Sequence, residues 1–130
     1  MPAIYLVDDH PVIRESYALL IELEDDFTLA GEADCGTQAL EDVPRAAPDL
    51  VLVDVQLPDM SGVDLVAQLH ARMPSLPIVM VSGHDDREVA RRAYEAGARA
   101  YVPKHEAADR LADVIRTVLA PSAETPAPTA

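Results

Sequence analysis

The chain has very few of the residues that build disulfides, zinc sites or flavin sites. Its only cysteine, Cys35, excludes an internal disulfide and any zinc site made of several thiolates. Tryptophan is absent, and four tyrosines and one phenylalanine offer no evident pair for stacking on a flavin ring. A chain without disulfides fits a reducing compartment, so we expect a cytoplasmic protein.

Long hydrophobic runs and basic charge are also scarce. No stretch reaches the ~18 apolar residues of a transmembrane helix, and the first residues lack the basic segment of a secretion signal. Ten basic residues stand against 23 acidic ones, which gives a formal net charge of −13. This charge repels phosphate backbones, so we expect no nucleic-acid binding by this chain alone and no membrane association. An acidic site that recruits a cation would suit it better.

Lysine is the rarest of the charged residues. The ten basic residues include a single lysine, Lys104, and the others are arginines. Lysine carries a compact ammonium, whereas arginine carries a planar fork of donors. A requirement for an amine at position 104 would explain why one basic residue is a lysine. The alternative is chance in a chain whose basic residues are mostly arginine.

The apolar residues follow two periods that alternate along the chain. Short runs rich in Val, Ile and Leu predict strands at residues 3–8, 27–33, 50–54, 77–82 and 99–103, with helices between and after them. This is the pattern of a parallel sheet covered by helices. We therefore predict an α/β, flavodoxin-like, doubly wound fold with a five-stranded parallel sheet in the order 2-1-3-4-5 and helices on both faces.

The length fits one domain. We assign it to residues 1–119 and interpret residues 120–130, which are rich in Pro, Ala, Ser and Thr, as a disordered tail or the start of a linker.

The first helix is predicted to turn one apolar side toward the core. Val12, Ile13, Leu20 and Leu23 are assigned to that side, and the polar Arg14 is expected to face outward. In the third and fourth helices, Ser61 and Asp85 are the expected N-caps, and Gly97 is the expected stop of the fourth.

Polar side chains stand where the predicted strands end. They are Asp8 and Asp9 after the first strand, Asp54 after the third, Ser82 after the fourth and Lys104 after the fifth. The carboxyl ends of parallel strands share one edge of a sheet, where such folds bind ligands, so these side chains should converge. Three carboxylates raise one another's pKa values and need a cation, and an all-oxygen site suits Mg²⁺. With an ammonium and a hydroxyl beside them, the set is typical of phosphoryl transfer to a carboxylate.

Four motifs in this order, IYLVDD, LVLVDVQLPDMSG, IVMVSG and AYVPK, together resemble the response-regulator receiver family of two-component systems. The opening DDHPVIRESYALLIELEDDFTLAGEA is similar to the NarL/LuxR-type branch of that family. The resemblance covers about residues 3–119. It implies that Asp54 is the phosphoacceptor and that Mg²⁺ is held by Asp9, Asp54 and the backbone carbonyl of Gln56, with Asp8 acting through water.

The resemblance also implies roles around the phosphoryl group. Ser82 and Lys104 would contact its oxygens, and Ser82 with Tyr101 would form the conformational switch. Gln56 and His84 occupy positions that resemble those tuning dephosphorylation.

The same resemblance implies partners. A sensor histidine kinase or a phosphotransfer protein would donate the phosphoryl group, and the chain would assist its own phosphorylation and dephosphorylation without being an enzyme for another substrate. A homodimer through the fourth helix, the fifth strand and the fifth helix is possible under this reading. Transcription would be regulated if a longer native chain carries a helix-turn-helix domain.

Two other function classes need residues that this sequence lacks, and a third stays open. A phosphatase of the haloacid dehalogenase type needs a second carboxylate where Gln56 stands. A flavodoxin-like carrier needs a phosphate-binding loop rich in Ser, Thr and Gly where the sequence reads DDHP. A degenerate receiver that docks to a partner without phosphorylation stays open. The four histidines show no spacing of a zinc motif.

Overall fold

The computed structural model describes residues 2–83 and 86–120. Its sheet has five parallel strands in the order β2-β1-β3-β4-β5. The strands are β1 (Ala3–Val7), β2 (Thr28–Ala33), β3 (Leu50–Asp54), β4 (Ile78–Ser82) and β5 (Ala100–Pro103). The predicted doubly wound α/β fold and its strand order are confirmed.

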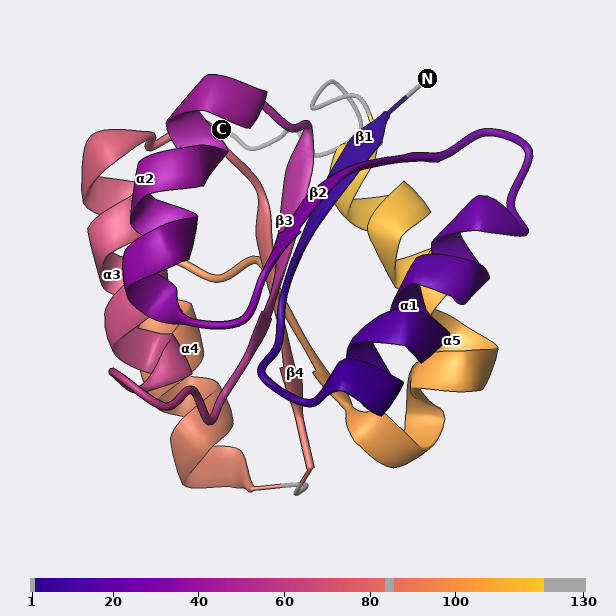
Figure 1. Cartoon of the computed structure of the whole chain (residues 1–130). Coiled ribbons are helices and arrows are strands. Elements are labelled where there is room, and N and C mark those ends of the chain that lie inside the picture. Colours follow the sequence, from indigo (N-terminus) through magenta and orange to yellow (C-terminus); the bar gives the residue numbers. More distant parts are fainter. Residues whose placement is uncertain (1, 84–85, 121–130) are drawn as a thin grey trace, which may run out of the picture.

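Five helices cover the two faces of the sheet. They are α1 (Pro11–Glu22), α2 (Gly36–Ala46), α3 (Gly62–Arg72), α4 (Arg87–Ala96) and α5 (Lys104–Leu119). Helices α1 and α5 lie on one face, and α2, α3 and α4 lie on the other (Figure 1). Within the described ranges, no helix is both long and apolar enough to cross a membrane.

The core forms two apolar layers, one on each side of the sheet. In β1, Tyr5 and Val7 pack on the side of α2, α3 and α4, whereas Ile4 and Leu6 pack on the side of α1 and α5. Successive side chains of a strand point to opposite faces, so a sheet covered on both faces requires continuous apolar strands. This explains why the central strands read as unbroken runs of Val, Ile and Leu.

Helix α1 buries a different face from the predicted one. Its buried residues are Tyr17 and Ile21, with Ile13 packed against the same layer. Val12 and Leu23 are 72% and 67% exposed, so their assignment to the core was wrong. Residues four apart share one side of a helix, and Ile13, Tyr17 and Ile21 make the continuous stripe that Val12 and Leu23 flank.

The helix ends match the sequence signals with one exception. Ser61 caps α3, and Gly97, with φ of 125°, ends α4 as predicted. The N-cap of α4 is Asp86, whose side chain accepts from two backbone amides of the first turn, and the helix begins at Arg87. The assignment of this cap to Asp85 was therefore off by one residue. Asp85 itself, His84 and residues 121–130 lie outside the described residues, so the role of His84 and the nature of the tail stay predictions.

Candidate functional site

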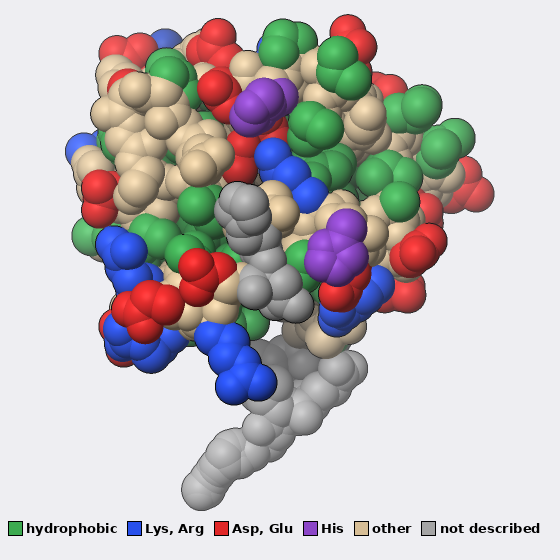
Figure 2. Space-filling view, turned by 90° about the horizontal axis from the view of Figure 1, so that it is seen from below, with side chains coloured by type: hydrophobic (Ala, Val, Ile, Leu, Met, Phe, Trp, Pro, Cys, Tyr) green, Lys and Arg blue, Asp and Glu red, His purple; other side chains and the backbone are tan. Residues whose placement is uncertain are grey.

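The structure brings the five predicted polar side chains to one edge of the sheet. They stand at or just after the carboxyl ends of their strands, and they are Asp8, Asp9, Asp54, Ser82 and Lys104. Figure 2 looks onto this end of the molecule, where acidic side chains gather beside a histidine and a basic side chain. The convergence expected from the fold is therefore present.

Asp8 and Asp54 are almost completely buried. Their exposed fractions are 2% and 4%, so neither carboxylate has much contact with water. Burial raises the pKa of Asp54, and the nearby charge of Asp8 raises it further, while Lys104 and the amide of Gln56 act in the opposite direction. The folded protein thus holds a carboxylate whose negative charge is poorly compensated.

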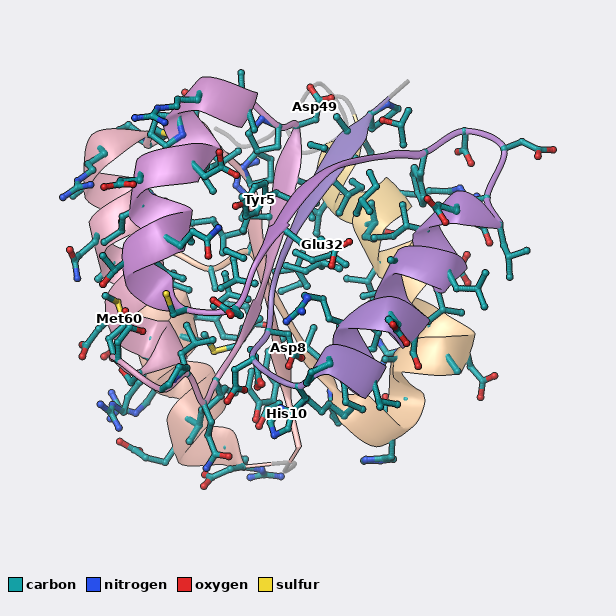
Figure 3. All side chains as sticks on the ribbon, in the orientation of Figure 1. Tyr5, Asp8, His10, Glu32, Asp49 and Met60 are labelled. Atoms are coloured by element: carbon teal, nitrogen blue, oxygen red, sulfur yellow. The ribbon has the colours of Figure 1, made fainter. Side chains whose placement is uncertain are left out.

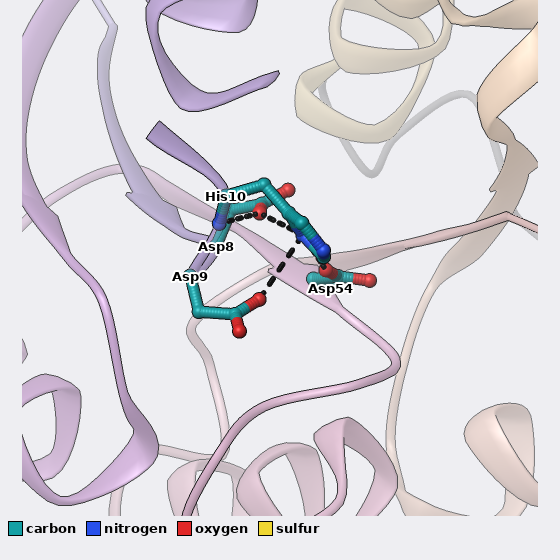
Figure 4. Close-up of side chains that lie close together, drawn as sticks. All are labelled: Asp8, Asp9, His10 and Asp54. Atoms are coloured by element: carbon teal, nitrogen blue, oxygen red, sulfur yellow. Dashed lines mark hydrogen bonds and ion pairs between the residues drawn. The ribbon is translucent and has the colours of Figure 1, made fainter. Parts of the chain in front are cut away.

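His10 lies inside this acidic cluster. Its Nδ1 atom is 3.2 Å from Asp8 Oδ1, 3.1 Å from Asp9 Oδ1 and 3.7 Å from Asp54 Oδ2 (Figure 4). Its backbone amide also donates to Asp8 Oδ1 at 2.8 Å. His10 was not among the site residues predicted from the sequence, although it directly follows the aspartate pair.

Lys104 supplies a fixed cation to the site. It is the first residue of α5, its side chain is 22% exposed, and its Nζ lies 3.3 Å from Asp54 Oδ2 and 3.8 Å from Asp8 Oδ2. Strand β5 ends at Pro103, and α5 begins at once, which aims the side chain at the edge of the sheet. The only lysine of the chain therefore contacts the candidate phosphoacceptor.

Two oxygens of the cluster have cationic or imidazole nitrogens within 4 Å but no hydrogen bond within the described residues. Asp8 Oδ2 and Asp9 Oδ1 are buried and accept no hydrogen bond from the described residues. One ligand atom from each of Asp8, Asp9, His10 and Asp54 can be chosen so that all lie within 4.8 Å of one another. Buried carboxylate oxygens that accept no hydrogen bond fit a hard divalent cation, because three carboxylates meet here and a cation would add to the positive charge of Lys104.

The loop after Asp54 folds back on the strand end. The amide of Gln56 donates to Asp54 Oδ1 at 3.3 Å, and the amide of Gly62 donates to Val55 O at 2.6 Å. A Cβ atom on Gly62 would lie 2.1 Å from the carbonyl oxygen of Asp54. Only glycine fits this close approach, so Gly62 is tied to the geometry of the acceptor.

A hollow of about 150 Å³ opens beside Asp54. Ser82, Lys104 and Asp86 also line it, and Ser82 is 3% exposed. A hydroxyl and an ammonium beside a carboxylate can bind the oxygens of a small anion. Tyr101 is half-buried and packs against the apolar layer of α2, α3 and α4.

Arg14 was predicted to face outward, and this prediction was wrong. Its Nη1 donates to the backbone carbonyl of Asp8 at 2.6 Å, and its Nε donates to Glu32 Oε1 at 3.0 Å. Helical periodicity places Arg14 away from the apolar stripe, but the first turn of α1 lies at the edge of the sheet, where a polar side chain finds backbone partners.

Asp59 was also missed. It lies in the loop after the acceptor and accepts from the amides of Gly36 and Thr37 and from the Thr37 hydroxyl, at 2.8, 2.8 and 2.6 Å. The hydroxyl of Thr37 and these amides lower the pKa of Asp59 to about 2. The N-cap residue of α2, Cys35, makes no side-chain cap bond of its own, so a loop distant in sequence caps the helix.

Comparisons with known proteins agree with this geometry. The model of the family described as response regulator receiver domain matches residues 4–116. The DNA-binding transcriptional activator DevR/DosR of Mycobacterium tuberculosis is 35% identical over 118 residues, which are 91% of this chain and 54% of that protein. The transcriptional regulatory protein UhpA of Escherichia coli is 33% identical over 118 residues, which are 91% of this chain and 59% of that protein. The chain thus spans little more than half the length of these relatives.

Among solved structures, a two-component response regulator of the LuxR family from Aurantimonas sp. SI85-9A1 superposes with a TM-score of 0.89 at 32% identity. The match covers 92% of this chain and 86% of that one.

Proposed function

This chain belongs to the response-regulator receiver family of two-component systems, and we propose that it acts as a receiver by accepting a phosphoryl group on Asp54. The observation that carries the proposal is a nearly buried carboxylate whose Oδ2 lies 3.3 Å from the ammonium of Lys104, at the mouth of a small hollow. Two other carboxylates and a hydroxyl stand beside it.

The reaction transfers one phosphoryl group. An oxygen of the Asp54 carboxylate bonds to phosphorus, and the bond from phosphorus to the donor breaks, which leaves an acyl phosphate on Asp54. With acetyl phosphate the leaving group is acetate. With a phosphohistidine donor the phosphorus–nitrogen bond breaks, and the imidazole takes up a proton. Positioning and charge neutralisation supply most of the catalysis in such transfers.

The donor set fits Mg²⁺. Asp9, Asp54 and the backbone carbonyl of Gln56 would hold the ion, and Asp8 would act through water. When bound, Mg²⁺ neutralises charge on the carboxylates and on the incoming phosphoryl oxygens. Support comes from the buried oxygens Asp8 Oδ2 and Asp9 Oδ1, which accept no hydrogen bond in the part of the chain that the structure describes. His10 is a nitrogen donor, which Mg²⁺ disfavours, so we assign it no ligand role.

Lys104 and Ser82 would receive the phosphoryl oxygens. The Lys104 ammonium is held at the acceptor, and the Ser82 hydroxyl lines the same hollow. A new bond to Ser82 would bias the end of β4, and Tyr101 on the neighbouring strand β5 would respond as the switch residue. Gln56 and His84 would tune the lifetime of the acyl phosphate.

The partners follow from the chemistry. A sensor histidine kinase or a phosphotransfer protein would supply the phosphoryl group, and α4, β5 and α5 would form the surface that changes, with a homodimer as one outcome. Both relatives are transcriptional regulators, and the match covers 54% and 59% of their lengths. We infer that the output is transcriptional where a DNA-binding domain accompanies the receiver, and that this chain alone, at a net charge of −13, binds no DNA.

The proposal is tested by combining metal binding with phosphorylation. Calorimetry should show one Mg²⁺ bound per chain, and acetyl phosphate should add one phosphoryl group only when Mg²⁺ is present. Addition of a chelator should prevent the reaction. A chain that binds Mg²⁺ but never gains a phosphoryl group would instead support a docking module that works without phosphorylation.

A further inference from the structure

We propose that Arg14, held by Glu32, is a positioning residue that orients Asp9 for metal binding. The inference rests on the proposed function, because it takes Asp9 as a metal ligand. Within the described residues, Arg14 forms no hydrogen bond or ion pair with a carboxylate of the acidic cluster. Its bond is to the backbone carbonyl of Asp8, at 2.6 Å.

The bond acts on Asp9 through the peptide plane. The carbonyl of Asp8 and the amide of Asp9 belong to one rigid, planar peptide group. A donor that fixes the carbonyl therefore fixes the plane, and with it the position of the Asp9 Cα atom that carries the side chain. The amide of Asp8 is already bonded to Ala33 O at 3.1 Å, so the Arg14 bond completes the anchoring of this turn.

Glu32 keeps the guanidinium in place. It lies on β2, beside β1, and accepts from Arg14 Nε at 3.0 Å. Figure 3 shows Glu32 on β2 and Asp8 just past the end of the neighbouring strand β1, with α1 alongside them. Arg14 thus connects α1, β2 and the turn after β1 through two hydrogen bonds, one donated by its Nε atom and one by its Nη1 atom. Its side chain is 22% exposed, so the bonds are partly sheltered from water.

Charge and positioning predict opposite effects on Mg²⁺ affinity. Loss of the Arg14 cation makes the acidic edge more negative, and by charge alone it would strengthen the binding of Mg²⁺. Loss of the bond to Asp8 frees the peptide plane and would weaken binding. Outer partners that orient metal ligands typically account for about 10- to 100-fold in affinity. The sign of the change therefore separates the two roles.

The test compares four variants of the full chain by Mg²⁺ calorimetry. Arg14→Met keeps the aliphatic length but removes every donor, and its dissociation constant for Mg²⁺ should rise about 10- to 100-fold. Arg14→Lys keeps the charge but cannot make both forked bonds, so its affinity should fall between that of Arg14→Met and the parent chain. Glu32→Gln should raise the constant less than Arg14→Met. Arg72→Met, at the far end of α3, removes the same charge and should leave the affinity unchanged.

Circular dichroism confirms that each variant is folded, and Glu32→Gln carries the test if Arg14→Met does not fold. The inference would be overturned if Arg14→Met bound Mg²⁺ as tightly as the parent chain or more tightly. If Arg14→Met does not fold, an unchanged Mg²⁺ affinity of Glu32→Gln would overturn it. Phosphorylation by acetyl phosphate separates this failure from failure of the proposed function. If Arg14→Met is phosphorylated slowly and saturating Mg²⁺ restores the parental rate, the result supports the positioning role. If the parent chain binds Mg²⁺ but takes up no phosphoryl group, the proposed function is wrong. The comparison of Mg²⁺ affinities still decides the role of Arg14 in that case.

Discussion

Lys104 Nζ lies 3.3 Å from Asp54 Oδ2, although 50 residues separate the two in the sequence. The contact arises because β3 and β5 flank β4 in the sheet and end at the same edge. It places the only ammonium side chain of the protein on the candidate phosphoacceptor.

Replacement of Lys104 by arginine should slow phosphorylation while the charge is kept. A planar guanidinium cannot occupy the position of a compact ammonium against a buried carboxylate and a phosphoryl group. Misplacement by ~1 Å can reduce rates by up to about 100-fold, and we expect a loss of about 10- to 100-fold. Rates with acetyl phosphate at saturating Mg²⁺ measure it. An arginine variant at the parental rate would show that only the charge matters.

Asp54→Asn should make the metal-free protein more stable at neutral pH. Burial and the charge of Asp8 raise the pKa of Asp54 in the folded protein. The stability that this group contributes is therefore fully present below its unfolded pKa of ~3.9. That stability is lost as the pH rises through the higher folded pKa. At pH 7 the ionised carboxylate therefore lowers stability. The neutral amide should recover on the order of 1 kcal/mol in urea unfolding.

The same comparison has a second readout. Mg²⁺ should stabilise the parent chain more than Asp54→Asn, because a ligand that binds only the folded state adds stability that grows with the logarithm of its affinity. An Asn variant that is less stable than the parent at pH 7 without metal would contradict the assigned electrostatics.

Gly62→Ala should distort the acceptor loop. Its Cβ atom would lie 2.1 Å from the carbonyl oxygen of Asp54, which is backbone and cannot move aside cheaply. We expect a loss of about 1–3 kcal/mol in thermal or urea unfolding, together with slower phosphorylation. Gly83→Ala is the matched control for stability, because no atom lies within 4 Å of the added Cβ. Equal stability of the two variants would refute the proposed constraint.

Ser82→Ala should uncouple the phosphorylated site from β5. Ser82 is nearly buried, lines the hollow beside Asp54 and is paired with Pro103 across the β4–β5 ladder. Without the hydroxyl, phosphorylation should produce smaller NMR shifts on residues 87–103, because the new contact that biases the switch is lost. Shifts of parental size on Tyr101 and α4 in this variant would show that the signal takes another route.

Much of the site was predictable because its residues stand at strand ends. Asp54, Ser82 and Lys104 each follow an apolar run, and a parallel sheet brings such ends together whatever their distance in sequence. The exposed Val12 was not predictable, because Val12 and Ile13 are adjacent apolar residues and periodicity alone does not decide which of the two is buried. Arg14 and Asp59 were missed for a different reason. Each bonds to backbone groups of a distant element, and no sequence spacing encodes that pairing.

The central claim is that Asp54 is the phosphoacceptor, and mass spectrometry tests it most directly. The chain is incubated with acetyl phosphate and Mg²⁺, its intact mass is measured, and the labile acyl phosphate is reduced with borohydride so that the modified residue can be located in peptides. We predict one phosphoryl group per chain, located on Asp54, and none on Asp54→Asn under the same conditions. A phosphoryl group on any other residue, or an undiminished adduct on Asp54→Asn, would contradict the account.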